Sequence, residues 1–286
     1  MDINPRHLVT TSLLADKFHQ VPLSADAAFP AVLLEIVGRH AVDTYLPLFP
    51  EEMMLAARLR DGKQFQESVK VLVPSLATAR LCADKLALCE FLAGHGVLTP
   101  ETASAAKPLN ADEVFLKPRD GTGSRGARKV RRAELAEITG AAPDRWLVQE
   151  ICMPPEVTVD AFIDGGAGFT CVICRERIEI KAGVSTKCRL FENPELTRLA
   201  AKLADALDLN GSFCFQVMRH PGGWAVTDVN PRPGAATAMC AATGNDFFAA
   251  TFAHCWGEDA RAFFRRLNSE QYVTRQYSEF VMGAGE

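Results

Sequence analysis

The sequence predicts an α/β (α+β) protein with a small first region and a larger second one. Apolar runs of strand length alternate with stretches at helical spacing along the 286 residues. Turns rich in glycine and proline separate neighbouring strand-like runs, as in β-hairpins. Apolar side chains make up 48% of the chain, which supports sizeable cores in one large or two modest domains.

Composition excludes several classes of function. The formal net charge is −4, and no basic block or aromatic-interleaved stripe occurs, so a nucleic-acid partner is not expected. No run approaches a membrane span, and the N-terminus has no long apolar segment, so we expect a cytoplasmic protein without membrane contact. Nine scattered cysteines indicate reduced thiols. Cys171 and Cys174 form the only C-x-x-C pair, and on a strand they point to opposite faces, which favours core positions over a metal site.

Residues 1–75 are expected to form the small α/β region. The pattern predicts a strand at Leu8–Thr11, a helix at Phe29–Arg39, a strand at Ala41–Leu46 and a helix that begins at Pro50. No glycine-rich turn links a strand to a helix here, so this region shows no nucleotide site.

A lysine and a glycine-rich loop follow. The spacing predicts one amphipathic helix over residues 74–94, with Lys85 in its middle, and a strand at Val114–Pro118 that ends in Lys117. Gly121, Gly123 and Gly126 spell G-x-G-x-x-G. A dinucleotide-binding fold needs a helix directly after the third glycine, whereas a strand is expected here. In a protein kinase the lysine follows the glycine loop, whereas Lys117 precedes it. The remaining interpretation is a glycine hairpin whose N–H groups cover triphosphate oxygens beside Lys117.

The middle of the chain continues with strands and one helix. We expect a strand that runs into residues 149–152, an alternating strand at Glu156–Asp164, and a helix capped by Asn193. The basic segment 175–189 is as consistent with a solvated strand face as with a binding site. The tail predicts helices at 246–256 and 260–267 and a strand at 275–282.

A hairpin over residues 211–235 carries the most informative polar pattern. Asp228, Asn230 and Arg232 are expected on one strand face, with Gln216 on the partner strand within reach. One carboxylate and two amide carbonyls suit Mg²⁺ that bridges phosphate oxygens, and a guanidinium can neutralise a transferring phosphoryl group. Taken alone, this pattern more often marks a solvated hairpin face.

The order of these motifs resembles the ATP-grasp superfamily, and most closely its carbamoyl-phosphate-synthase-like carboxylate–amine ligases. The resemblance covers about residues 75–282, and Gln216 with Asn230–Arg232 is its most specific part. It implies an ATP-grasp fold, in which two α+β subdomains clasp ATP. Residues 76–155 would form the nucleotide lid and hinge and residues 156–286 the catalytic, metal-binding subdomain. Residues 1–75 would be a truncated, Rossmann-like domain.

The resemblance also implies roles for individual residues. Lys85 and Lys117 would approach the α- and β-phosphates, and Glu156 would bind the ribose. Arg232 would contact the γ-phosphate and the acyl phosphate, and Arg175 or Lys187 would pair with the substrate carboxylate. The flap would comprise Gly121, Thr122, Gly123, Ser124 and Gly126, the adenine contacts Gln149, Glu150, Ile151 and Cys152, and the metal ligands Gln216, Asp228 and Asn230. Such enzymes usually carry Glu where Asp228 stands.

The implied function is an ADP-forming carboxylate–amine or amino-acid ligase that forms an acyl phosphate from ATP, with one or two Mg²⁺ or Mn²⁺ ions. Its partners would be a small carboxylate and an amine, with a homodimer or a partner subunit by analogy. Three alternatives stay open: a carbamoyl-phosphate-synthase-like enzyme, an ATP-binding regulatory subunit or pseudo-enzyme, and a plain α/β binding protein. None of the six histidines lies in a motif.

Overall fold

The computed structural model describes residues 1–121, 123 and 125–283. The chain divides into two compact units, one formed by Met1–Leu76 with the chain from Gln276 onward and the other by Ala77–Arg275. Within the described residues, no helix is both long enough and apolar enough to cross a membrane.

The first unit consists of short helices and one short pair of strands. Its elements are η1 (Arg6–Leu8), η2 (Thr10–Leu13), α1 (Phe29–Arg39), β1 (Thr44–Tyr45), α2 (Pro50–Asp61) and β2 (Lys70–Val71). β1 and β2 pair in parallel. Phe29, Leu33 and Val37 recur every four residues on α1 and are buried against α2. Helices at the predicted places are confirmed, while a Rossmann-like domain stays a prediction.

The predicted strand at residues 8–11 is wrong. Leu8 ends one 3₁₀ turn and Thr10 begins the next. Its amides bond locally: Leu8 N–H donates to the Pro5 carbonyl at 2.9 Å, and Ser12 N–H donates to the Val9 carbonyl at 2.9 Å. Leu8 is 67% exposed, so this segment lacks the buried face that would hold it in a sheet.

The second unit contains two antiparallel sheets. The smaller has the order β3-β6-β4-β5. Its strands are β3 (Thr102–Ser104), β4 (Glu113–Pro118), β5 (Arg128–Arg131) and β6 (Trp146–Gln149), and the nearby helices are α3 (Leu76–Ala83), α4 (Lys85–Gly94), η3 (Arg132–Glu134), α5 (Leu135–Thr139) and η4 (Pro143–Arg145). Val114, Leu116 and Val148 form its core with Leu135 of α5.

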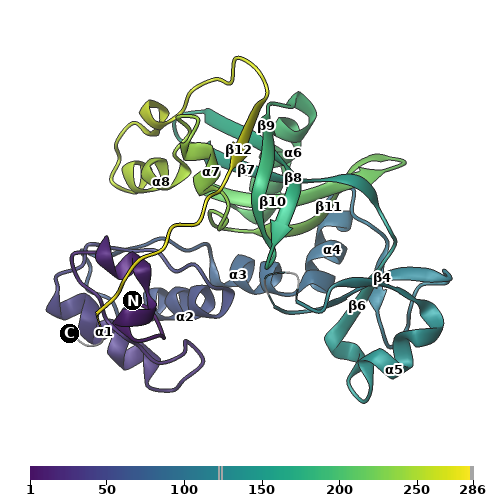
Figure 1. Cartoon of the computed structure of the whole chain (residues 1–286), viewed down its shortest axis with the longest axis horizontal. Coiled ribbons are helices and arrows are strands. Elements are labelled where there is room, and N and C mark those ends of the chain that lie inside the picture. Colours follow the sequence, from purple (N-terminus) through teal and green to yellow (C-terminus); the bar gives the residue numbers. More distant parts are fainter. Residues whose placement is uncertain (122, 124, 284–286) are drawn as a thin grey trace. The chain divides into compact units, whose positions relative to one another are not determined.

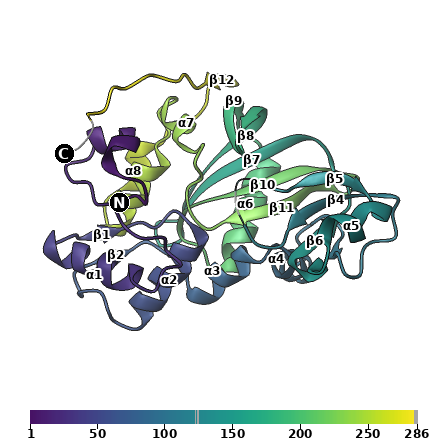
Figure 2. The ribbon, with the colours of Figure 1, turned by 60° about the horizontal axis from the view of Figure 1, so that its bottom comes forward.

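The larger sheet has the order β11-β10-β7-β8-β9-β12 and is antiparallel throughout. Its strands are β7 (Met153–Asp164), β8 (Phe169–Lys181), β9 (Val184–Phe191), β10 (Gly211–His220), β11 (Gly223–Asn230) and β12 (Gln271–Thr274). The predicted hairpin is therefore confirmed as β10 and β11, which meet at a turn after His220. Figures 1 and 2 show both sheets from two directions.

The two faces of the larger sheet are covered by different helices. Val157, Val159 and Ala161 point from β7 into a core with α6 (Pro194–Leu207), which Asn193 caps as predicted. Phe162 points to the opposite core. That core also contains α7 (Ala238–Ala241), α8 (Phe247–Cys255) and η5 (Ala260–Phe263). Helix α6 thus covers one face of the sheet, and α7, α8 and η5 pack against part of the other.

Two predictions for the tail need correction. The helix at 260–267 is only the short η5. The last strand is β12 and not 275–282, because Gln271–Thr274 pairs with β9 and the chain then leaves the sheet after Arg275 N–H donates to the Thr186 carbonyl. Cys174 and Cys171 lie against opposite cores, as predicted.

Candidate active site

The polar face of the β10–β11 hairpin brings the predicted metal ligands together. Gln216 lies directly opposite Asp228, and Asn230 lies opposite Cys214 in the next row. Residues two apart on a strand share a face, so Asp228 and Asn230 point to the same side, which is the side that Phe162 occupies on β7. All three predicted ligands are half-buried, so their oxygens remain accessible.

This donor set determines which ion it could hold. Among the described residues, no group of three or more histidine, cysteine, aspartate or glutamate side chains is placed to bind a metal. Gln216, Asp228 and Asn230 supply one carboxylate and two amide oxygens, which are hard ligands of the kind Mg²⁺ takes. With a single protein carboxylate, phosphate oxygens would have to balance much of the ion's charge. The residues therefore fit a magnesium ion that is shared with a polyphosphate.

Lys117 reaches this hairpin from the smaller sheet. It lies on β4, is 8% exposed, and its Nζ donates to the carbonyl of Thr227 at 2.9 Å. Burial lowers the pKa of the Lys117 ammonium, and the charge of Asp228 opposes this effect. Because its hydrogen-bond acceptor is a neutral carbonyl, this buried ammonium would be stabilised by an anion that binds beside it.

Lys85 does not lie in mid-helix as predicted. The helix is broken at Asp84, whose carboxylate accepts hydrogen bonds from Leu86 N–H and Ala87 N–H, so Lys85 begins α4. Its Nζ donates to the Gly121 carbonyl at 2.8 Å. The break has a local cause, since an aspartate in extended conformation is a favourable N-cap. It turns Lys85 towards the glycine loop.

Asp84 also anchors the start of that loop. Arg119 donates from Nε and Nη2 to the two carboxylate oxygens of Asp84 at 2.8 and 2.7 Å. This hydrogen bonding lowers the pKa of the Asp84 carboxyl. One aspartate therefore fixes both the beginning of α4 and the strand end that leads into the glycine loop.

The glycine loop adopts backbone conformations that require glycine. Gly121, Gly123 and Gly126 all have positive φ, at 111°, 70° and 77°. Gly123 lies against Gly183 in the β8–β9 turn, so closely that a Cβ on Gly183 would be 2.5 Å from the Gly123 carbonyl oxygen. The predicted flap residues Thr122 and Ser124 lie outside the described residues.

Four residues, from the last residue of β6 to the one before β7, were predicted to contact adenine. The Gln149 side chain points inward, where its Nε2 donates to Thr102 Oγ1 at 2.9 Å. Ile151 is 43% exposed, and Cys152 is half-buried with its thiol pKa raised to about 11 by burial. The backbone N–H of Glu150 donates to the Glu101 carbonyl at 2.9 Å. Ile151 and the backbone beside it are thus the accessible part of this segment.

His220 of β10 contacts this segment, although it lies in no sequence motif. Its Nε2 lies 2.7 Å from Oε1 of Glu150. Its Nδ1 accepts a hydrogen bond from Gly222 N–H at 3.1 Å, so a neutral ring carries its proton on Nε2, facing the carboxylate. The turn of the hairpin is thereby connected to the segment between the sheets.

Glu156 is paired inside the unit. Its carboxylate forms an ion pair with Arg177, whose side chain is 3% exposed. Arg177 also donates from Nη2 to the Gly183 carbonyl at 2.9 Å. Glu156, the predicted ribose contact, is consequently linked through one arginine to the turn that packs on Gly123. The Glu156 side chain retains 31% exposure.

Arg175 is almost completely removed from solvent. Thr158 of β7 pairs with Gln216 on one side and with Arg175 on the other, so the three residues lie in one row across the sheet. The Arg175 side chain is nevertheless only 2% exposed. Its Nε and Nη2 donate to the two oxygens of Asp160, at 3.0 and 3.3 Å. The guanidinium therefore has an internal partner. Lys187, the other predicted carboxylate partner, pairs with Glu179 at 2.9 Å.

Arg232 lies in the loop after β11, so strand alternation does not set its direction. Its Nη1 donates to the Pro233 carbonyl at 2.9 Å, while its Nε is buried without a hydrogen-bond partner among the described residues. Gly234 N–H donates to Thr237 Oγ1 at 2.7 Å, and that hydroxyl donates to Asp160. The loop that carries Arg232 is thus tied to the buried Asp160–Arg175 pair.

Sequence reasoning missed Asp160, Arg119, Arg177 and Thr237. Asp160 had a detectable signal, because it is a charged residue in an alternating strand whose neighbours are apolar. Its partner Thr237 is 77 positions away and follows a Pro-Gly turn with no pattern of its own.

Comparison with known proteins gives a consistent result. Residues 82–236, more than half of the chain, match the model of the ATP-grasp domain family. No curated protein sequence matches.

Solved structures of similar fold include three informative proteins. The biotin carboxylase domain of Hydrogenobacter thermophilus 2-oxoglutarate carboxylase, in complex with MgADP and bicarbonate, matches with a TM-score of 0.68 at 17% identity over 86% of this chain and 61% of its own. Thermus thermophilus N5-carboxyaminoimidazole ribonucleotide synthetase matches with 0.64 at 18% over 83% and 67%. Bacillus licheniformis L-amino acid ligase matches with 0.61 at 16% over 85% and 62%. The chain thus spans 61–67% of the length of these proteins, and the similarity establishes the shared fold.

Proposed function

The chain belongs to the ATP-grasp family, and on this basis we propose that it is an ATP-dependent carboxylate–amine ligase that releases ADP and phosphate. One observation carries the proposal: the Gln216–Asp228 pair of the hairpin lies beside the buried ammonium of Lys117, which contacts the carbonyl of Thr227. An anion-binding cation and hard oxygen donors at one place are what a metal–triphosphate complex requires.

Each group has a defined part in binding the nucleotide. Lys117 and Lys85 contact the α- and β-phosphates, and the N–H groups of the glycine loop cover them. Ile151 offers an apolar surface for the adenine, while Glu156 accepts hydrogen bonds from the ribose. Gln216, Asp228 and Asn230 hold the magnesium ion, which supplies charge neutralisation at the phosphates when bound.

The chemistry proceeds in two steps. A carboxylate oxygen of the acid attacks the γ-phosphorus, the bond from that phosphorus to the β–γ bridging oxygen breaks, and ADP leaves. Arg232 stabilises the charge on the transferred phosphoryl group, so catalysis is mainly positioning and electrostatic. The amine then attacks the acyl carbon, phosphate leaves with the C–O bonding electrons, and the amine nitrogen releases its proton to solvent.

The ion pair between Arg175 and Asp160 limits which nitrogen of Arg175 could contact a substrate. Because Asp160 occupies the Nε–Nη2 edge of the guanidinium, Nη1 is the remaining nitrogen, and it donates to Ser185 Oγ at 3.4 Å. We propose that Arg175 meets a substrate carboxylate through this nitrogen, or that the exposed Lys187 does so. The Michaelis constant of Arg175→Ala for the acid distinguishes the two: an unchanged value would assign the contact to Lys187.

A regulatory ATP-binding protein is the second candidate, and the single carboxylate of the metal site favours it. A coupled assay of ADP release from Mg-ATP, with pools of amino acids and of small carboxylic acids, separates the two functions. The ligase releases ADP with one pool, and Asp228→Ala abolishes the release. A regulatory protein is stabilised against heat by Mg-ATP and releases no ADP with any pool.

A further inference from the structure

The first part of β8 lacks a strand neighbour on one side. Phe169–Ile173 pairs with β7, whereas the pairing of β8 with β9 begins only at Cys174. After Phe191 the chain turns away from the sheet into α6. Within the described residues, no other strand pairs with this five-residue edge. An open edge of this kind presents backbone N–H and C=O groups that can bond to another chain.

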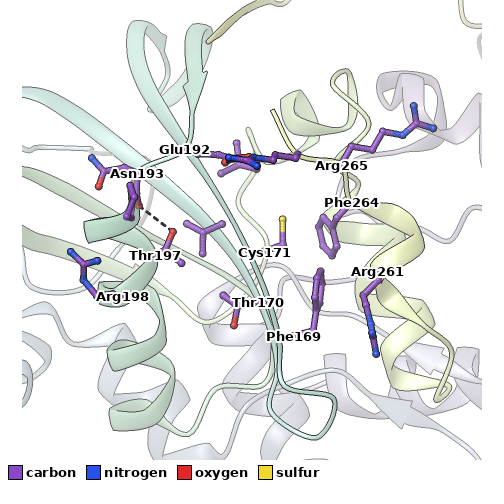
Figure 3. A pocket seen from close by; sticks show the side chains of 14 residues that line it. Phe169, Thr170, Cys171, Glu192, Asn193, Thr197, Arg198, Arg261, Phe264 and Arg265 are labelled. Carbon is purple, nitrogen blue, oxygen red and sulfur yellow. Dashed lines mark hydrogen bonds and ion pairs between the residues drawn. The ribbon is translucent and has the colours of Figure 1, made fainter. Parts of the chain in front are cut away.

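A groove of about 610 Å³ runs along this edge. Figure 3 shows the start of α6 on one side, with Asn193 and Thr197, and the segment that carries Arg261, Phe264 and Arg265 on the other. Phe169 and Phe264 lie 5.8 Å apart between ring centroids and form an apolar floor. All five residues of the unpaired edge line the groove, so its extent suits a short extended chain.

The rim of this groove carries excess positive charge in a protein whose net charge is −4, although Arg261 is paired with Asp259 at 3.2 Å. Four arginines line it, Arg198, Arg261, Arg265 and Arg266, against the single acid Glu192. Arg198 and Arg265 form no ion pair within the described part of the chain, and Arg266 lies 3.9 Å from Glu192 with its side chain 87% exposed. One oxygen of Glu192 already accepts the Leu267 N–H at 2.9 Å.

We propose that this groove binds an acidic, extended polypeptide segment of a partner protein, which adds as a strand to the open edge of β8. Backbone hydrogen bonds to residues 169–173 provide affinity, as in other cases of strand addition. The arginines select carboxylates by charge-assisted hydrogen bonds. A second copy of the same edge is disfavoured, because the two arginine rims would face each other.

The test uses the full-length protein and a fluorescent heptapeptide of alternating glutamate and valine. Five residues of strand span about 17 Å, so seven residues cover the edge. Two control peptides have lysine in place of glutamate, or proline in place of the central valine. The double variant Arg198→Glu, Arg265→Glu is compared with Arg58→Glu, an exposed arginine of α2. Anisotropy gives affinity, and hydrogen exchange reports the amides of residues 169–173.

The proposal predicts saturable binding of the acidic peptide, weakened about tenfold or more in the double variant and unchanged in Arg58→Glu. Those amides of residues 169–173 that point away from β7 gain protection only in the complex. Equal binding of the proline peptide would mean charge attraction alone and would overturn strand addition. Absence of saturable binding, or unchanged binding by the double variant, would overturn the site itself. ADP release plays no part in this readout, so the result is independent of the proposed ligase function.

Discussion

At the scale of single residues, charge and burial give Lys117 its importance. Its ammonium is largely removed from water and donates to the neutral carbonyl of Thr227, and the charge of Asp228 offsets its burial only in part, since the pKa of Lys117 stays below its ordinary value. A phosphate oxygen would supply the missing negative charge. Burial of this ammonium therefore lowers the folding stability, and a bound phosphate would offset that cost.

We predict that Lys117→Met lowers the affinity for MgADP by about tenfold or more, since about 1.4 kcal/mol corresponds to each factor of ten. The same substitution should not reduce the free energy of unfolding, because an apolar side chain costs less to bury. Calorimetric titration and thermal unfolding measure the two effects. Lys129→Met is the matched control, an exposed lysine of β5 paired with Glu113 at 2.6 Å. Equal ADP affinity in both variants would show that Lys117 does not contact phosphate.

Thr237 determines the position of the Arg232 loop through one hydroxyl. We expect Thr237→Val to destabilise the protein by about 1–3 kcal/mol, because the half-buried Gly234 N–H and the buried carboxylate of Asp160 each lose a partner. The turnover number should fall while ADP affinity changes little, since the proposed role of Arg232 is on the transferred phosphoryl group. The control is Thr251→Val, whose hydroxyl bonds only along its own helix to the Phe247 carbonyl. A loss of stability with full turnover would contradict the positioning role.

At the scale of elements, Asp84 couples the start of α4 to the glycine loop. We predict that Asp84→Asn retains the cap but frees Arg119, so MgADP affinity falls several-fold. Asp246→Ala, which removes the equivalent cap of α8, should lower stability without changing ADP affinity. Loss of affinity in the Asp246 variant would contradict the specific role of Asp84.

The same contact predicts a pH dependence. Arg119 holds the pKa of Asp84 below its ordinary value in the folded protein. The contribution of the Asp84–Arg119 contact to the free energy of unfolding is therefore complete above the unfolded-state pKa of about 3.9. It is lost as the pH falls through the lower folded-state pKa. The stability difference between the wild-type protein and Asp84→Asn should accordingly shrink between about pH 5 and pH 2 in urea unfolding. A difference that grows towards acid pH would contradict this account.

The β8–β9 turn gives a second test at this scale. Gly183 and Gly168 both have positive φ, at 78° and 61°, but only Gly183 is packed, against Gly123. Both alanine substitutions should cost about 1 kcal/mol of backbone strain. Only Gly183→Ala should also weaken MgADP binding, because its methyl group displaces the glycine loop. Equal ADP affinity of the two variants, measured by titration, would exclude a link between this turn and the nucleotide.

At the scale of the whole molecule, the sequence predicted most of the local elements and fewer of their contacts. The hairpin and the capped helix at Asn193 are confirmed, because alternation, caps and turn residues are local signals. The ATP-grasp fold was expected from the resemblance of the motif order to that family, and the family match confirms it. The break at Asp84 was missed, since helical spacing continues across it. The Asp160–Thr237 and Glu150–His220 contacts join distant segments, and no local pattern reports such pairs.

The central claim is that this chain makes an acyl phosphate from a carboxylate and ATP. The most direct measurement supplies Mg-ATP, each pool of acids and hydroxylamine as the amine, and quantifies nucleotide products and hydroxamate together. The account predicts ADP, phosphate and hydroxamate in equal amounts with one pool, and none of them with Asp228→Ala. Release of AMP and pyrophosphate, or of ADP without hydroxamate, would contradict it.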